Sequence, residues 1–365
     1  MPKNLFLFLS LILSFQFSKA QTQSANSLEF SPQISFATFT DGRKLTGTAY
    51  GAEFLYHINT ENNPKAWMRS LNLKSIDLVY NYKNMGNIKI LNDPREAMFG
   101  DSHAVLGALS ILLLKAKQTE FLFSPALGLS YVSKTFFTNQ NPLIGSRINF
   151  AVRGALKITT PITSSTSLSA GIDLLHHSSA SLRIPNKGMN TVNLGIGIIH
   201  SLSPYPKHID TTNAKSEYKK YSFDFGVNIG RRGDYQSKGG HFKTGLNAYY
   251  NYRLGNAIGI SGGVDAVYYH SVYDSLNNAY AKQLFANSYD HWRVGLAVGP
   301  DFWMGKLALM LKYGYYLHYN SVRHTNTYWT TGLRYDVKNW VALQGKAYIH
   351  KVEADYIGFG FIFTP

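Results

Sequence analysis

A repeated alternation of apolar and polar residues along nearly the whole chain constrains its fold more than any other feature. Successive side chains of a β-strand point to opposite faces, so this pattern predicts strands that each carry one apolar face. No long window shows the 3.6-residue period of an amphipathic helix. We therefore expect an all-β protein.

The alternating runs predict about sixteen antiparallel strands in two sets of eight. The first set is expected at roughly residues 29–40, 47–60, 73–84, 100–116, 120–134, 146–160, 166–179 and 190–203. The second is expected at roughly residues 218–230, 241–254, 257–272, 288–303, 306–320, 324–337, 340–350 and 354–363. A polar, proline-marked stretch at 204–217 separates the sets and is expected to be a periplasmic connection.

The N-terminal residues have the organisation of a secretory signal. Lys3 precedes an almost wholly apolar run at 5–15, and small residues lead to a cleavage site after Ala20. We expect residues 1–20 to be removed on export. The apolar run falls short of the ~20 residues that a spanning helix needs, and no later segment reaches that length. Any membrane insertion must then be as a closed barrel.

The composition fits an outer-membrane β-barrel. The chain has 25 Tyr, 22 Phe and 31 Gly, and its lack of cysteine excludes disulfides and thiol chemistry. The net charge of +15 falls to +13 once Lys3 and Lys19 leave with the signal. The basic residues are scattered and form no nucleic-acid motif, so anionic lipid headgroups are the expected partner, and nucleic acid is not.

The connections between predicted strands alternate in length. Tight turns at 254–256, 304–306 and 338–340 alternate with longer loops such as 231–240 and 274–287. Short periplasmic turns and longer outer loops are typical of outer-membrane barrels. With both termini periplasmic, the loop after Ser179 faces outward, where lipopolysaccharide resides.

Two closures of the strands are possible: one large barrel, or two tandem eight-stranded barrels. The sets at 21–203 and 218–365 resemble a weak repeat, since hairpins end both. Alternating aromatic residues at 356–363 resemble a barrel-insertion signal, which the first set lacks. On this ground we favour one large barrel.

The hairpin at 166–202 carries the candidate catalytic residues. Leu168, Ala170, Ile172 and Leu174 share one strand face with His176 and Ser178, and Asn190 opens the neighbouring strand on the same face. Serine-catalysed ester cleavage needs a base, a group that orients the base, and donors for the oxyanion. His176, Asn190 and the loop residue Asn186 could supply these, which suggests chemistry on a lipid. No cofactor is needed.

Other assignments of these residues are weaker. His177 and Ser179 could form the pair instead, but they share the opposite face with Asp173. Adjacent strand histidines point apart, so they cannot chelate one metal ion. Arg231, Arg232 and Lys238 could hold lipid phosphates or be plain solvated charge.

The segment around this hairpin resembles the PagL family of lipid A 3-O-deacylases, also called acyloxyacyl hydrolases. The resemblance rests on His176-x-Ser178, on Pro185-Asn186-x-Gly188 and on the run at 141–146, and it covers about residues 30–203. It implies an eight-stranded outer-membrane barrel with His176 as base, Ser178 as nucleophile and Asn186 at the oxyanion. The remainder looks like longer, Bacteroidetes-type members.

Two positions depart from the family pattern. Ser179 stands where the family has an asparagine of the oxyanion hole, and Asn190 where it has the triad glutamate. A neutral amide can fix the imidazole tautomer but cannot stabilise imidazolium by charge. We expect an outer-membrane deacylase acting on lipid A of lipopolysaccharide. The alternatives are a non-catalytic porin-like or structural barrel with a decayed site, and a phospholipase. The oligomeric state and the acyl chain removed are left open.

Overall fold

The computed structural model describes residues 26–40, 42–60, 63, 65–95, 98–202, 218–235, 237–273, 288–321, 324–351 and 353–365. The predicted signal at 1–20 and the predicted connection at 204–217 lie outside these residues.

The described residues form β-strands with two short helices. Around the first barrel they are β1 (Ser27–Phe39), β2 (Leu45–Thr46), β3 (Ala49–Asn59), α2 (Ala66–Ser70), β4 (Leu73–Asn84), β5 (Lys89–Ile90), β6 (Asp101–Ala116), β7 (Thr119–Val132), α3 (Phe136–Asn139), β8 (Ile148–Pro161), β9 (Thr166–Ser178) and β10 (Met189–Ser201). The second barrel contains β11 (Tyr221–Gly233), β12 (Gly240–Arg253), β13 (Ile258–Tyr269), β14 (Trp292–Met304), β15 (Leu307–His318), β16 (Thr327–Lys338), β17 (Val341–His350) and β18 (Glu353–Phe363). The sixteen long strands match the predicted ones within a few residues.

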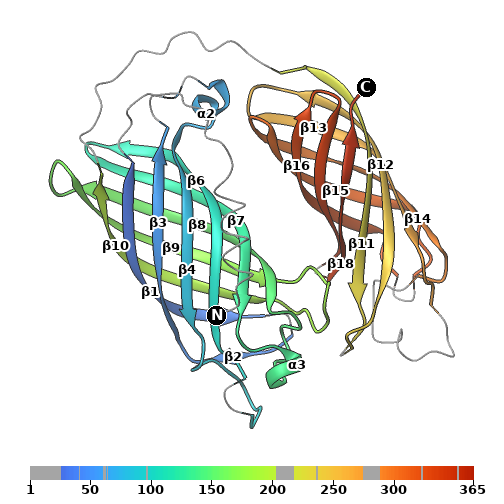
Figure 1. The fold of residues 1–365 in the computed structure, drawn as a ribbon, viewed down its shortest axis with the longest axis horizontal. Helices are drawn as coiled ribbons and strands as arrows, with labels where there is room; N and C mark the ends of the chain where they lie inside the picture. Colours follow the sequence, from blue (N-terminus) through green and yellow to red (C-terminus); the bar gives the residue numbers. More distant parts are fainter. Residues whose placement is uncertain are drawn as a thin grey trace.

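The strands close into two separate antiparallel barrels, which stand side by side in Figure 1. β1 pairs with both β3 and β10, and β11 pairs with both β12 and β18. The all-β, outer-membrane-type fold of two eight-strand sets is confirmed, but our preference for one large barrel is wrong. The aromatic residues at the end of β18 do not determine whether the strands form one barrel or two. That depends on whether the second partner of β1 is a strand of its own set or of the other set. That strand is β10, over nearly the full length of β1.

The outward face of each strand is largely apolar, although some apolar residues, such as Leu175, are buried inside the barrel. On β9 the outward residues Leu168, Ile172 and Leu174 are exposed, while the inward residues Asp173 and His177 are buried inside the barrel. This arrangement inverts that of a water-soluble protein. It is stable where the surroundings are lipid rather than water.

Polar side chains, together with a cluster of eight buried apolar residues, fill the interior of the first barrel. Glu29 accepts hydrogen bonds from Lys157 at 2.7 Å and Ser169 at 2.7 Å, and Arg153 pairs with Glu53 at 2.9 Å. A buried charge is costly unless it is paired and hydrogen-bonded, so these networks are what makes a polar interior tolerable. Eight strands enclose a space just wide enough for side chains. The interior is thus a packed core.

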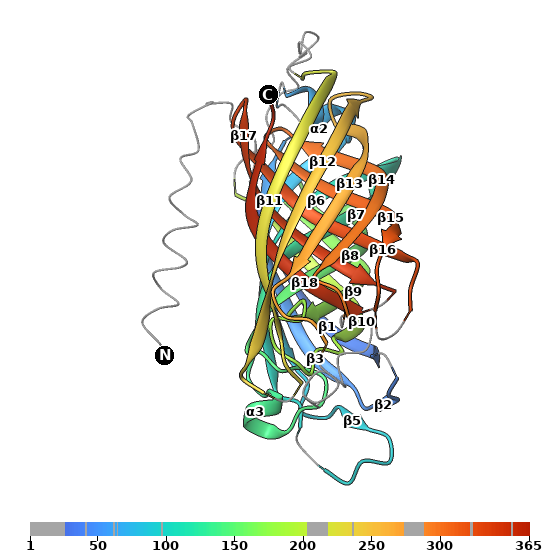
Figure 2. The same ribbon diagram turned by 90° about the vertical axis from the view of Figure 1, so that its right-hand side faces the viewer.

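The two ends of each barrel differ, and the same end carries the longer loops in both. We call this the loop end; it also holds α3 and the small β2–β5 sheet, which Figure 2 shows together at the bottom. The opposite end, the turn end, holds α2. There, a Cβ on Gly305 of the β14–β15 turn would lie 3.2 Å from Trp67 Nε1 of α2, so the barrels also approach each other at this end. In the part of the chain described, neither helix is long and apolar enough to cross a membrane.

Candidate functional site

His176 and Asn190 face each other across β9 and β10 at the loop end. They are direct partners in the strand register, and both side chains are half-buried on the outward face. His176 Nδ1 lies 2.8 Å from Asn190 Oδ1, and Asn190 Nδ2 donates to the carbonyl of Phe39 at 3.1 Å. The carboxamide is therefore held from both sides.

This arrangement fixes the tautomer of His176. Because the Phe39 carbonyl can only accept, the amide nitrogen of Asn190 must point to it, and the amide oxygen must point to the imidazole. The proton then resides on Nδ1 of His176, which donates to Asn190. Nε2 is left with its lone pair and can act as a base.

Ser178 receives hydrogen bonds from two donors. Its Oγ accepts from Asn186 Nδ2 at 3.0 Å and from the backbone N–H of Ala180 at 3.1 Å. Its hydroxyl also lies 3.2 Å from Asn186 Oδ1. Both residues of the pair are described, and no hydrogen bond joins Ser178 to His176, although the two side chains share one face of β9. Catalytic hydrogen bonds are often formed only when substrate is bound.

The loop after β9 makes the donors converge on Ser178. The Ser179 carbonyl accepts from Leu182 N–H at 3.1 Å, and the two residues between them have φ values of 49° at Ala180 and 68° at Ser181. Left-handed conformations at two successive non-glycine residues are strained and occur mainly where function requires them. This turn directs the Ala180 N–H back to the Ser178 hydroxyl.

Asn186 is oriented by Ser179. Its Oδ1 accepts from the Ser179 N–H at 2.8 Å, so its Nδ2 faces Ser178. A β-bridge to Ile144 holds the backbone of Asn186 from the other side. The amide is thus a pre-oriented donor beside the candidate nucleophile.

Because Gly188 has no side chain, it leaves room for the His176 imidazole. It has φ of +69°, and a Cβ there would lie only 2.7 Å from His176 Cε1. The Thr40 hydroxyl donates to the Gly188 carbonyl at 2.7 Å, which ties this backbone to the segment after β1. A side chain at this position would push His176 away from Asn190.

We expect Gly188→Ala to lower hydrolytic activity about ten- to a hundredfold with the barrel intact, because a displacement of about 1 Å can cost that much. Gly305→Ala is the matched control, since Gly305 has the same φ of +69° in a turn at the opposite end of the structure, where its would-be Cβ lies 3.2 Å from the Trp67 side chain. Rates on purified protein, with folded-barrel migration on unheated gels, check this. Equal loss in both variants would show that backbone strain, and not the clash with His176, is responsible.

The other residues considered from the sequence lie elsewhere. His177 points into the barrel, fully buried, with Nδ1 2.9 Å from Ser130 Oγ, and Ser179 Oγ donates to the Arg183 carbonyl at 3.0 Å. The pair His177 and Ser179 is therefore not on the lipid side. Arg232 is neither solvated nor free to bind phosphate, because it is buried and bound to β18.

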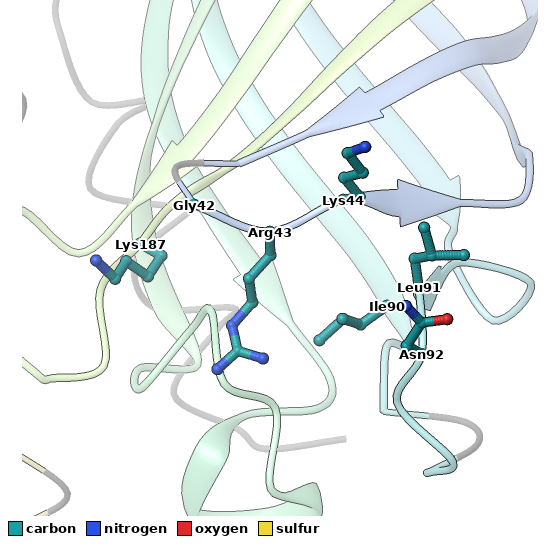
Figure 3. A pocket seen from close by; sticks show the side chains of 7 residues that line it. All are labelled: Gly42, Arg43, Lys44, Ile90, Leu91, Asn92 and Lys187. Atoms are coloured by element: carbon teal, nitrogen blue, oxygen red, sulfur yellow. The ribbon is translucent and has the colours of Figure 1, made fainter.

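An open pocket of about 520 Å³ adjoins the site at the loop end. Arg43 and Lys44, from the segment after β1, and Lys187, from the loop before β10, are among its lining residues, and Figure 3 shows the Arg43 and Lys44 side chains pointing to opposite sides of the chain. Thr40 Oγ1 lies 3.2 Å from the Lys187 carbonyl, so pocket and site share one piece of backbone. The nearby acid Asp93 is paired with Arg95 at 2.6 Å. The pocket lining thus contains three cationic residues and no acidic one.

Sequence reasoning brought His176, Ser178, Asn186 and Asn190 to one place but missed their supports. The Ala180 N–H is a backbone donor, and its direction depends on the type of turn. No residue of the loop has a side chain that predicts this turn type. The Phe39 carbonyl and the Thr40 hydroxyl come from a distant strand end. Only the Gly188 position carried a signal, as the glycine of the Pro-Asn-x-Gly loop.

Comparisons with known proteins relate both barrels to described families. The family described as lipid A 3-O-deacylase (PagL) matches residues 48–198, and the family described as acyloxyacyl hydrolase, C-terminal domain, matches residues 221–365. A comparison with curated protein sequences gave no match. Together the two matched ranges take in most of both barrels.

Three solved structures illustrate the likeness to barrels. Neisserial surface protein A is 11% identical, with a TM-score of 0.33 over 49% of this chain and 98% of its own. The outer membrane enzyme PagL is 19% identical, with a TM-score of 0.31 over 46% of this chain and 97% of its own. Omp33 of Acinetobacter baumannii is 8% identical, with a TM-score of 0.18 over 93% of this chain and 97% of its own.

The fold and the matched families define an integral β-barrel protein of the bacterial outer membrane, of a hydrolase class. More particularly, the chain belongs to the PagL family of lipid A deacylases and carries the family's C-terminal acyloxyacyl hydrolase domain as its second barrel.

Proposed function

We propose that the protein hydrolyses an ester-linked acyl chain of lipid A, with Ser178 as nucleophile and His176 as general base. The observation that carries the proposal is the outward-facing cluster of imidazole, hydroxyl and two carboxamides at the loop end. An acid–base pair on the membrane-facing side of a barrel has access to lipid and little else. The cationic pocket beside it suits the phosphates of lipid A.

The reaction follows the usual course of serine ester hydrolysis. Ser178 exchanges its bond with Asn186 Oδ1 for one to His176 Nε2, attacks the ester carbonyl carbon, and gives its proton to the imidazole. Asn186 Nδ2 donates to the developing oxyanion. When the tetrahedral adduct collapses, the ester C–O bond breaks and the imidazolium protonates the departing sugar oxygen.

Water completes the cycle. His176 removes a proton from a water molecule, which attacks the acyl-enzyme carbonyl, and the imidazolium returns that proton to Ser178 as the fatty acid leaves. Asn190 keeps Nδ1 protonated throughout, so Nε2 remains the base. As a neutral amide it offers the imidazolium no compensating charge, and the expected turnover is slow.

The filled interiors weigh against the porin-like alternative. Side chains such as Arg153 and Lys157 occupy the first barrel and are 2% and 8% exposed, and Lys346 in the second is 3% exposed. A solute channel needs a wider barrel than eight strands provide. A non-catalytic structural barrel and a phospholipase remain as rivals that experiment can separate.

The test is mass spectrometry of membrane lipids from cells with and without the expressed protein. The proposal predicts lipid A lighter by one acyl chain, with the matching free fatty acid. Shortened phospholipids with intact lipid A would instead identify a phospholipase. If both lipid classes keep their masses, the barrel is not a hydrolase under these conditions and the proposal fails.

A further inference from the structure

We propose that the second barrel holds the catalytic loop of the first barrel in its working shape, with Ser181 as the positioning residue. This inference rests on the proposed function and extends it, because it assigns the C-terminal domain a role in the same reaction. It concerns the loop at 179–188, which joins β9 to β10 and contains the strained turn beside Ser178.

The loop is bound to the second barrel through backbone groups and through the Ser181 hydroxyl. The Ser181 carbonyl accepts from the Gly233 N–H at 2.8 Å, and the Ser181 hydroxyl donates to the Ala354 carbonyl at 2.5 Å. Further along, Ile184 forms a parallel β-bridge with Tyr235. In Figure 1 this loop leaves β9 and reaches the ends of β11 and β18. The Arg183 guanidinium also donates to the Lys238 carbonyl, so the second barrel contacts the loop at three residues.

These contacts involve the turn residues that shape the site. Ser181 follows Ala180, whose N–H donates to Ser178 Oγ, and both residues have positive φ. A left-handed pair of this kind costs free energy and persists only where its surroundings enforce it. Within the first barrel the turn is held by the Leu182 N–H on the Ser179 carbonyl, by the Ala180 N–H on Ser178 Oγ and by the Ser179 hydroxyl on the Arg183 carbonyl. The carbonyl and the hydroxyl of Ser181, by contrast, are bound by Gly233 of β11 and Ala354 of β18.

The second barrel is rigid where it makes these contacts. Asp355, next to Ala354, is fully buried and binds Arg293 at 2.8 Å and Tyr269 at 2.9 Å. Lys243 also donates to the Asp355 carboxylate, and Arg232 donates to the carbonyls of Ala354 and Asp355. The carbonyl that receives Ser181 is therefore anchored to a buried network of charges rather than to a mobile turn.

Gly233 offers a way to separate the barrels without touching the site. A Cβ there would lie 3.0 Å from Arg183 Cα and 3.0 Å from the Leu182 carbonyl oxygen, so the branched side chain of Gly233→Val would force the loop away. Gly255, in a turn at the other end of the same barrel, has no atom within 4 Å of its would-be Cβ. Gly255→Val is the matched control.

We expect Gly233→Val to lower kcat at least about tenfold with KM little changed, because the loop loses its geometry while the lipid-facing surface stays intact. Gly255→Val should keep wild-type values, and both variants should migrate as folded barrels. Ser181→Ala, which removes only the hydroxyl bond to Ala354, should give a smaller loss of kcat. Wild-type kcat in folded Gly233→Val would overturn the proposal.

A crosslinking arm reports docking without any enzyme assay. The chain has no cysteine, so Ile184→Cys with Tyr235→Cys introduces a single pair. Bridged residues lie about 5 Å apart, within the range of a disulfide. Oxidation should join the two positions in membranes, and adding Gly233→Val should prevent it. Absence of the crosslink in the double-cysteine chain would refute the docking. A chain that crosslinks but never deacylates would instead refute the proposed function, and the positioning role with it.

Discussion

Ser178→Ala should abolish release of an acyl chain from lipid A while both barrels fold normally. Removing the nucleophile of a serine hydrolase lowers the rate by roughly 10⁴- to 10⁶-fold, and so small a residual rate would escape a lipid assay. The barrel should be unaffected, because the Ser178 hydroxyl is half-buried on the outward face and its partners are loop groups. Lipid A mass spectra of cells that express either form check this.

Ser167→Ala is the control for this substitution. Ser167 lies on the same strand at the turn end, far from His176, so the same change there should leave the activity unaltered. Activity in folded Ser178→Ala close to that of the wild type would show that another group attacks the ester, and the assignment of Ser178 would be wrong.

Asn190→Glu should raise the rate by at least about tenfold, because loss of the triad carboxylate in a serine protease costs about 10⁴ in rate. A carboxylate at this position would accept from His176 Nδ1 as the amide oxygen does, at 2.8 Å, and would also stabilise the imidazolium by charge. The change keeps the tautomer and adds the missing electrostatics. Rates on purified lipid A are the measurement.

A pH profile distinguishes charge from mere geometry in this variant. A carboxylate beside the imidazole favours its protonated form, so activity should begin to fall at a higher pH on the acid side than in the wild type. Asn190→Gln, a neutral control, should show no such shift. A lower rate in Asn190→Glu would mean that the Phe39 carbonyl, which now receives the Asn190 amide at 3.1 Å, cannot tolerate a charge nearby.

The local part of the fold was predictable from the sequence, and its closure was not. The alternation of apolar and polar residues locates strands such as β9 and assigns their faces, because successive side chains of a strand point to opposite sides. Closure depends on a pairing between residues far apart, such as Ser27 with Ser201. The aromatic residues of β18 gave no information on that pairing. The two-residue strands β2 and β5 are too short for any period.

The site shows the same division. Strand parity put His176, Ser178 and Asn190 on one face, and the register of β9 with β10 places His176 opposite Asn190. The turn at Ala180 and Ser181 could not be predicted, because neither residue favours positive φ and the turn is held by groups from the other barrel. A prediction from the loop sequence alone does not include the contacts that the second barrel makes with the loop.

The outward placement of the site has a consequence for how such a protein meets its substrate. A lipid would reach His176 and Ser178 by diffusing sideways within one leaflet, without leaving the membrane or entering a lumen. The quantity that governs encounter is then the number of lipid molecules per unit area, and the bulk concentration in the cell matters little. Tight packing of the leaflet would shield the ester even where the lipid is abundant, so the physical state of the membrane itself would set the pace of turnover.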